Sequence, residues 1–324
     1  MHNRLQYYRR IFHAYFSPAN SQLAFWHETP EINPRASVDS LGEYYMSFDK
    51  KARYDRHLDD DGVPMLDYRG IIGLQHNPIA IAQWGLGNYN LFHQTRQDDY
   101  RKKFILASDW LSAHLQRNTS GAWVWNHHFD WDYRDTLKAP WYSGLAQGQA
   151  ISVLVRAHSQ TKKPEYLEAA QRAFASFLAP VAEGGVSFTD SNGDLWFEEY
   201  IVSPPTHILN GFIWAAWGVH DYYLATGENT AKVLFQAAVK TLLKNLAAYD
   251  LGFWSLYEQS GTRMKMVASP FYHQLHVAQL RVMHALTGEE TFADVASRWE
   301  SYGRSRVKRT WAVCYKSAFK LAYY

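Results

Sequence analysis

The sequence predicts an all-α fold: an α/α barrel of about four helix pairs with short β-hairpins at one end and no β-sandwich domain. Three observations predict it: a repeated turn, a regular difference between the helices on its two sides, and a glycine-aromatic stretch further on. The turns read "FHQTRQDDY", "HSQTKKPEY", "LATGENTA" and "ALTGEETF". Their threonines lie 66, 65 and 61 residues apart, a spacing typical of a repeated supersecondary unit, at Thr95, Thr161, Thr226 and Thr287.

The helix before each turn is apolar on nearly all sides, whereas the helix after it has one polar face. An example of the first kind is "HILNGFIWAAWGVHDYY" (207–223). An example of the second is "YLEAAQRAFASFLAP" (166–180), in which apolar residues recur every three or four positions. Because a helix that is apolar all round is buried, we expect the first helices to form an inner ring and the second an outer one.

A glycine followed by alternating large residues comes after three of the outer helices, in "GAWVW" (121–125), "GGVSF" (184–188) and "LGFWSL" (251–256). This pattern favours short strands or hairpins. Each stretch precedes an inner helix, so we expect the hairpins to gather at one end of the ring, around a cavity. The segment "FEEYIVSPP" (197–205) leads to the same end.

Residues 1–70 have a helical start and lack the repeat, so we predict an N-terminal extension packed on the barrel. Residues 71–324 are then a single barrel domain. The final segment "WAVCYKSAFKLAYY" has the apolar spacing of a packed helix, and the sequence assigns it no role.

Composition excludes several classes of protein. The formal net charge of +2 argues against a general attraction to nucleic acid. The single cysteine, Cys314, cannot form an internal disulfide, and no run approaches the 18 apolar residues of a membrane span. The start "MHNRLQYYRRIFHAYF" lacks the apolar core of a signal peptide, so we expect a cytoplasmic protein without a membrane span.

The aromatic content of 16% has two explanations, a core that needs large side chains and a groove in which sugar rings pack on aromatic faces. Neither a Walker motif nor a nucleophile elbow is present, and "AQGQA" (146–150) follows no strand, so we read it as a close-packing or groove-facing helix start. The histidines lack the spacing of a metal motif, and we expect neither a metal nor a cofactor.

Carboxylates and tyrosines stand at equivalent loop ends of successive repeats. Glu198, Glu199 and Tyr200 precede one inner helix, Tyr257 lies in "SLYEQSGTR" and Tyr272 in "SPFYHQLH". A glutamate can take a proton and a tuned tyrosine can give one, so these residues suit proton transfer on a carbohydrate. A groove-wall or core role is the alternative for each tyrosine.

Five motifs together resemble one family. The segments "PWYSGLAQGQAISVLVRA", "WFEEY...PP...ILNGF", "LYE", "YHQLHVAQL" and "SRWESYGRSR" resemble the C-terminal domain of D-glucuronyl C5-epimerase across about residues 105–309. Enzymes of this family convert glucuronate to iduronate within heparosan or heparan sulfate. In animal members a segment like "GVPMLDYRGIIGLQHNPIAIAQWGLGNY" precedes a β-sandwich, but here it runs almost directly into "ASDWL".

The resemblance implies a catalytic α/α barrel, a homodimer, no chemical cofactor and a uronate-containing polysaccharide as substrate. It also implies that Glu199 and Tyr200 form the family's functional pair, with Tyr257 and Tyr272 as its further tyrosines. Glu199 and Tyr272 are expected to flank C5 of the sugar from opposite faces. Tyr200, Tyr257 and Arg263 are expected to hold the sugar's carboxylate.

We predict a wider set of substrate-binding residues from the same segments and their neighbours. Arg304 and Arg306 belong to a basic run that is either a solvated helix end or an anion-binding rim, and His276 is also expected to hydrogen-bond across its helix. The set is Glu198, Tyr142, Gln147, Asn210, Arg263, His276, Asn77, Arg304 and Arg306.

Two other functions remain open from the sequence. A polysaccharide lyase begins with the same removal of the C5 proton, and then expels the C4 oxygen. A catalytically silent carbohydrate-binding barrel would use the same groove without any proton transfer.

Overall fold

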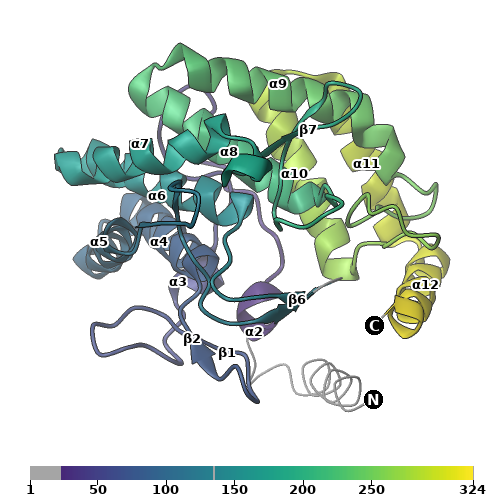
Figure 1. The fold of residues 1–324 in the computed structure, drawn as a ribbon, viewed down its shortest axis with the longest axis horizontal. Coiled ribbons are helices and arrows are strands. Elements are labelled where there is room, and N and C mark those ends of the chain that lie inside the picture. Colours follow the sequence, from purple (N-terminus) through teal and green to yellow (C-terminus); the bar gives the residue numbers. More distant parts are fainter. Residues whose placement is uncertain (1–22, 134–135, 324) are drawn as a thin grey trace.

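The computed structural model describes residues 23–133 and 136–323 and is mainly helical (Figure 1). Four helical hairpins follow one another along this described chain, as predicted. Their inner and outer helices are α4 (Pro78–Thr95) and α5 (Asp98–Ala113), α6 (Gly144–Thr161) and α7 (Pro164–Leu178), α8 (Leu209–Thr226) and α9 (Asn229–Asn245), and α10 (Pro270–Thr287) and α11 (Glu290–Arg304). The remaining helices are α2 (Leu23–Trp26), α3 (Asp49–Ala52), α12 (Arg306–Tyr323) and the short 3-10 turns η2 (Val181–Glu183) and η3 (Leu246–Tyr249).

The inner helices form the core of the barrel, with α6 between α4 and α8, and α10 packed on α8. The inner helices α4, α6 and α8 are buried throughout their first 14 residues, whereas the outer helices bury one face. Gly148 of α6 lies against α8, where an added Cβ would be 2.6 Å from Ala215 Cα. The close-packing interpretation of "AQGQA" is therefore confirmed.

The repeated threonines end each inner helix and start the turn that follows. Thr95 Oγ1 donates to Leu91 O at 2.7 Å and accepts from the backbone N–H of Gln97 at 3.3 Å. The same two hydrogen bonds recur at the other three turns, at Thr161, Thr226 and Thr287. Because each threonine hydroxyl donates back to its own helix and accepts from a backbone N–H of the turn, the sequence repeat has a physical cause.

Short hairpins lie at the end of the barrel where the inner helices begin, as expected. Each antiparallel pair precedes an inner helix, and every sheet in the described residues has two strands, so no β-sandwich is present there. "LGFWSL" differs from the prediction: it forms isolated bridges rather than a strand pair. The pairs are β1 (Leu66–Asp67) with β2 (Leu74–Gln75), β3 (Gln116–Arg117) with β4 (Trp123–Val124), β5 (Trp131–Asp132) with β6 (Thr136–Leu137), and β7 (Ser187–Thr189) with β8 (Leu195–Phe197).

The N-terminal part of the described chain packs into the helix ring. The ring of Tyr44 stacks on that of Trp214 with centroids 6.1 Å apart, and Tyr45 donates from its hydroxyl to Asp221 at 2.8 Å. These contacts attach Tyr44 and Tyr45 to α8, which is far from them in the sequence. The first 22 residues of the predicted extension lie outside the described residues, and the division of the chain at residue 70 stays a prediction.

A buried ion pair joins α6, α8 and this N-terminal segment. Arg156 Nη1 lies 2.6 Å from Asp221 Oδ2, with both side chains at most 1% exposed. Arg156 Nε also donates to Gly42 O at 2.8 Å. Removing either partner would leave the other charge buried and unpaired, which is strongly destabilising. The contact therefore holds α6, α8 and the N-terminal segment together.

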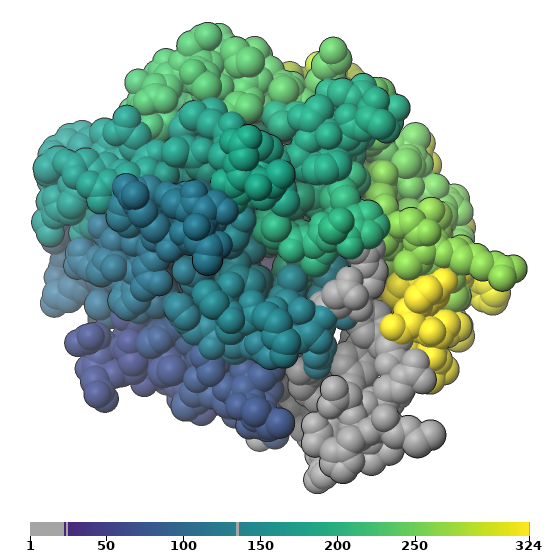
Figure 2. All heavy atoms as spheres, in the orientation of Figure 1, coloured from purple at the N-terminus to yellow at the C-terminus, as the bar shows by residue number. Residues whose placement is uncertain are grey.

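The helix α12 packs beside α11 at the side of the barrel (Figures 1 and 2). Ala312 and Phe319 are buried, which confirms the packed helix predicted for the final segment. No helix in the described ranges is long and apolar enough to cross a membrane.

Asp221→Ala is expected to lower the free energy of unfolding by about 3–5 kcal/mol, because it leaves the Arg156 charge buried without its partner. Urea denaturation monitored by circular dichroism measures this change. Asp294→Ala, at an exposed position of α11, is the control and is expected to change the free energy by less than about 0.5 kcal/mol. Equal effects of the two substitutions would contradict the structural role of the ion pair.

Candidate active site

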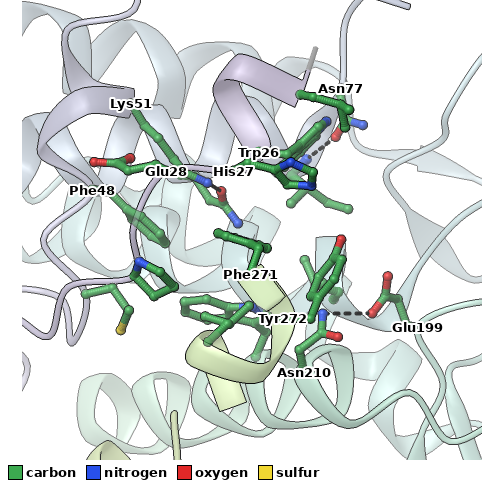
Figure 3. Close-up of a pocket in the computed structure, with 18 of the residues that line it drawn as sticks. Trp26, His27, Glu28, Phe48, Lys51, Asn77, Glu199, Asn210, Phe271 and Tyr272 are labelled. Carbon is green, nitrogen blue, oxygen red and sulfur yellow. Dashed lines mark hydrogen bonds between the residues drawn. The ribbon is translucent and has the colours of Figure 1, made fainter. Parts of the chain in front are cut away.

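A cavity of about 170 Å³ opens where the four inner helices begin (Figure 3). It has room for several water molecules or one small polar ligand. Each inner helix contributes to its wall, through Ile79 of α4, Leu145 of α6, Asn210 of α8 and Tyr272 of α10. The N-terminal segment 23–31 forms another part of the wall.

Glu199 is held between the starts of α6 and α8. The backbone N–H of Gly144 donates to Glu198 O at 2.9 Å, which fixes the loop against α6. On the α8 side an added Cβ at Gly211 would overlap the Glu199 carboxyl group. Asn210 Nδ2 donates to Glu199 Oε2 at 3.3 Å (Figure 3). The carboxyl group therefore enters the pocket from a position that two neighbouring helices define.

Glu199 is only 5% exposed, and this burial changes the acidity of its carboxyl group. Burial raises the pKa of its carboxyl group to about 8, and the nearby Glu258 and Glu198 carboxylates act in the same direction. Hydrogen bonds from Tyr200 and Asn210 oppose this rise. Near neutral pH the group can therefore exchange a proton, as an acid–base catalyst must.

Three tyrosines lie around this carboxyl group. The rings of Tyr257 and Tyr272 meet edge to face with centroids 4.9 Å apart, and the Tyr200 ring lies 4.7 Å from that of Tyr133. Burial, with the Glu199 charge as the next cause, raises the pKa values of Tyr200 and Tyr257 well above the ordinary value. These two phenols keep their protons and act as hydrogen-bond donors.

A polar cluster lies behind Tyr257 and includes α12. Lys316 Nζ donates to Val267 O at 2.7 Å and lies 5.4 Å from the centroid of the Tyr257 ring. Burial lowers the pKa of Lys316 to about 7, and Lys320 acts in the same direction, while Glu258 opposes the change. The final helix therefore supports one of the candidate tyrosines from outside the pocket.

The aromatic residues occupy two places, the core and the wall of the pocket. The fully buried tryptophans of the core are Trp84, Trp125, Trp196, Trp217, Trp254 and Trp299. The pocket has an aromatic wall of its own, made of Trp26, Phe48, Tyr68, Phe129, Trp131, Trp141, Trp214 and Phe271. An aromatic wall with a few polar groups is typical of sites that bind small polar ligands.

A family model described as "D-glucuronyl C5-epimerase C-terminus" matches residues 116–301, which is more than half of the chain. The chain belongs to the D-glucuronyl C5-epimerase family. This finding confirms the resemblance stated from the sequence motifs.

Individual relatives agree with the family match. The chain is 30% identical to D-glucuronyl C5-epimerase of Caenorhabditis elegans over 224 residues, which cover 64% of this chain and 36% of that protein. It is 27% identical to an uncharacterized protein of Methanocaldococcus jannaschii over 210 residues, which cover 62% of this chain and 67% of that protein. The chain therefore spans about a third of the nematode C5-epimerase.

A solved structure supports the fold alone. D-mannose isomerase matches with a TM-score of 0.54 at 10% identity, over 82% of this chain and 70% of that one. Together with the helix order, this likeness confirms the α/α-barrel prediction.

Five of the site residues predicted from the sequence line the pocket, and a sixth touches one of them. Tyr257 reaches the group through its ring contact with Tyr272. The lining residues among the predicted set are Asn77, Glu199, Tyr200, Asn210 and Tyr272. Asn77 also caps α4, because its side chain accepts from the first backbone N–H groups of the helix.

Two predicted binding residues on the inner helices are held inside the protein instead. Gln147 has no exposed surface, and its amide group donates to Trp123 O and Ser176 Oγ, both at 3.0 Å. His276 is also buried, and its Nδ1 lies 3.0 Å from Ser255 Oγ. Both side chains connect parts of the barrel, so the structure does not place them for substrate contact.

Glu198 and Tyr142 also have partners outside the pocket. Glu198 is paired with the His207 side chain and accepts from the His207 backbone N–H at 3.2 Å. The Tyr142 hydroxyl donates to Gly185 O at 3.4 Å. These contacts hold the loop and the hairpin in place beside Glu199.

The predicted arginines lie on the surface, away from the pocket lining. Arg263 is exposed in the loop after Tyr257. Arg304 pairs with Glu300 one helical turn earlier at 3.1 Å, and Arg306 is exposed at the start of α12. A role for Arg263 in holding the sugar's carboxylate at Glu199 is therefore not supported by its position.

Most polar and aromatic residues of the pocket were not predicted from the sequence, among them Lys51, Trp26 and Trp131. Lys51 and Trp26 belong to residues 1–70, which lack the repeat that located the other candidates. Trp131 comes from the β5–β6 hairpin. No metal-binding group of three His, Cys, Asp or Glu side chains occurs in the described part of the chain.

The difference in the free energy of unfolding between the native protein and the Glu199→Gln variant is expected to depend on pH. The folded pKa of Glu199, about 8, exceeds its ordinary value of 4.5, so the folded state holds the proton more firmly. The stabilisation is complete below the ordinary pKa and is lost as pH rises through about 8. Urea denaturation at several pH values should show the native protein losing stability relative to the variant from pH 5 to 8, with little further change above. A difference independent of pH would contradict the raised pKa.

Proposed function

We propose that the protein is a polysaccharide uronate C5-epimerase, which converts D-glucuronate to L-iduronate residues in a heparosan-like polymer. One observation carries the proposal: the buried carboxyl group of Glu199, from the loop before α8, and the phenol of Tyr272, from the first turn of α10, line the same pocket. Membership of the C5-epimerase family supports the same reaction. The aromatic wall supports a carbohydrate as the ligand.

The reaction inverts one carbon atom without any change in oxidation state. C5 carries a hydrogen next to the sugar's carboxylate, so removal of that proton gives a carbanion whose charge spreads onto the carboxyl group. The Glu199 carboxylate breaks the C5–H bond by taking the proton. The Tyr272 hydroxyl then donates its proton to the opposite face of C5, and exchange with water returns both groups to their starting states.

The environments of Glu199, Tyr200 and Tyr257 fit this reaction. A glutamate whose pKa is raised to about 8 is a stronger base, once ionised, than an ordinary glutamate. Tyr200 and Tyr257 remain protonated because their pKa values are raised, so they can donate to the charge that develops on the sugar's carboxyl group. Asn210 lies on the pocket wall, and its Oδ1 has no hydrogen-bond partner among the described residues, so it can accept from a sugar hydroxyl.

A lyase reaction and simple binding are distinguished by their products. A lyase forms an unsaturated uronate, which absorbs ultraviolet light, whereas an epimerase leaves absorbance unchanged and forms iduronate. A binding barrel gives neither product. Homodimer formation and a cytoplasmic location stay predictions from the resemblance and the sequence.

Glu199→Gln and Tyr272→Phe are each expected to reduce C5 hydrogen exchange at least 100-fold, because each removes a proton-transfer group. The measurement is NMR of heparosan incubated with the protein in deuterium oxide, with absorbance followed in parallel. Glu290→Gln is the matched control, since Glu290 is exposed at the opposite end of the barrel. Exchange retained in Glu199→Gln would remove Glu199 from the mechanism, and rising absorbance would favour the lyase.

Gly211→Ala is expected to reduce the same exchange about 100-fold, because the added methyl group displaces the Glu199 carboxyl from its position. Gly261→Ala is the matched control: an added Cβ there meets nothing within 4 Å. Circular dichroism of both variants verifies the fold. Full activity of Gly211→Ala would mean that the position of the carboxyl against α8 is unimportant.

A further inference from the structure

Lys51 is the one lysine or arginine among the described residues that line the pocket. It belongs to the short helix α3 and is only 7% exposed. Figure 3 shows its side chain on one side of the pocket and Glu199 on the other, with Phe271 and Tyr272 between them. The proposed reaction assigns this cation no role.

The ammonium group of Lys51 lies in an aromatic box. Its Nζ lies 4.9 Å from the ring centroid of Phe25, 5.5 Å from that of Trp26 and 5.2 Å from that of Phe48. Among the described residues it forms no ion pair and donates one hydrogen bond, to Gln83 Oε1 at 2.6 Å. An ammonium group has three donors, so two are available to a ligand.

The charge of Lys51 is incompletely compensated. Burial lowers the pKa of Lys51 to about 8, and the charge of the Glu28 carboxylate opposes this change. Glu28 Oε1 is occupied by the backbone N–H of Lys50 at 2.9 Å rather than by Lys51. A buried cation of this kind is stabilised when an anion enters its site, because both desolvated charges then gain a partner.

We propose that Lys51 binds a carboxylate of the polysaccharide and so selects uronate units over neutral sugars. The identity of the polymer in this inference rests on the proposed function. The aromatic box orients the ammonium group, and Gln83 is itself fixed by donating from Nε2 to Gln149 Oε1 at 3.0 Å. Lys51, rather than the exposed Arg263, is then the cation that recognises the acidic group.

The test compares an acidic ligand with a neutral one of the same length. Isothermal titration calorimetry measures binding of a heparosan hexasaccharide and of its carboxyl-reduced counterpart to four proteins: the native chain, Lys51→Met, Lys51→Gln and Lys50→Met. Methionine retains the straight apolar stem within the aromatic box, and glutamine is the second variant in case it folds poorly. Lys50→Met is the control, because the neighbouring Lys50 is exposed.

The native protein and Lys50→Met are expected to bind the acidic hexasaccharide at least tenfold more tightly than the reduced one, and both Lys51 variants to lose this preference. A preference kept by the Lys51 variants, or absent from the native protein, would overturn the proposal.

Deuterium exchange at C5, measured on the same samples, separates this inference from the proposed function. Exchange by the native protein together with an unchanged preference in the Lys51 variants would leave the epimerase standing and remove Lys51. Loss of the preference without any exchange in the native protein would support Lys51 as the anion site and remove the epimerase. A lower kcat in Lys51→Met would mean that the bound carboxylate belongs to the reacting sugar, whereas a change confined to KM would assign it to a neighbouring sugar.

Discussion

The close approach of α6 and α8 is the constraint on which the candidate site depends. Gly148 of α6 and Gly218 of α8 face each other so closely that neither position has space for a side chain. At the start of the same two helices, Gly144 holds the backbone of the Glu198–Glu199 loop and Gly211 leaves space for the Glu199 carboxyl group. The helix packing therefore determines both the position and the burial of the proposed base.

Burial is also what gives the site its chemistry. In the pocket it raises the pKa of Glu199 and lowers that of Lys51, so each group is closer to neutral than in water. The two groups lie on opposite sides of the cavity and do not form an ion pair with each other (Figure 3). A ligand that carries both an acidic group and a removable proton can place the acidic group at Lys51 and the proton at Glu199. This arrangement is consistent with a uronate and gives no advantage to a neutral sugar.

The sequence predicted the barrel well because its signal is local and repeated. Each Thr turn contains the hydrogen bonds that end one helix and start the next, as at Thr95, so the pattern reports the structure directly. The sequence predicted the positions of Glu199 and Tyr272 for a related reason: Glu199 lies in the loop before α8 and Tyr272 in the first turn of α10, at the same end of the barrel. Lys51 carried no such signal, because its place in the pocket depends on contacts with distant segments, such as its hydrogen bond to Gln83.

Gln147 was predicted to bind substrate but is bonded within the protein instead. A polar residue on an apolar inner helix has the same sequence pattern whether its partner is a substrate or the protein itself. In the structure its amide is used by the backbone and by α7, which only the folded geometry reveals. Surface arginines such as Arg304 were equally ambiguous, since a basic run at a helix end carries no information about the distance to a cavity.

The most direct test of this account is a crystal structure of the Glu199→Gln variant with a heparosan oligosaccharide bound. The account predicts one uronate ring in the pocket, with C5 between residue 199 and the Tyr272 hydroxyl on opposite faces. A ring bound outside the pocket, or with both side chains on the same face of C5, would contradict the proposed inversion.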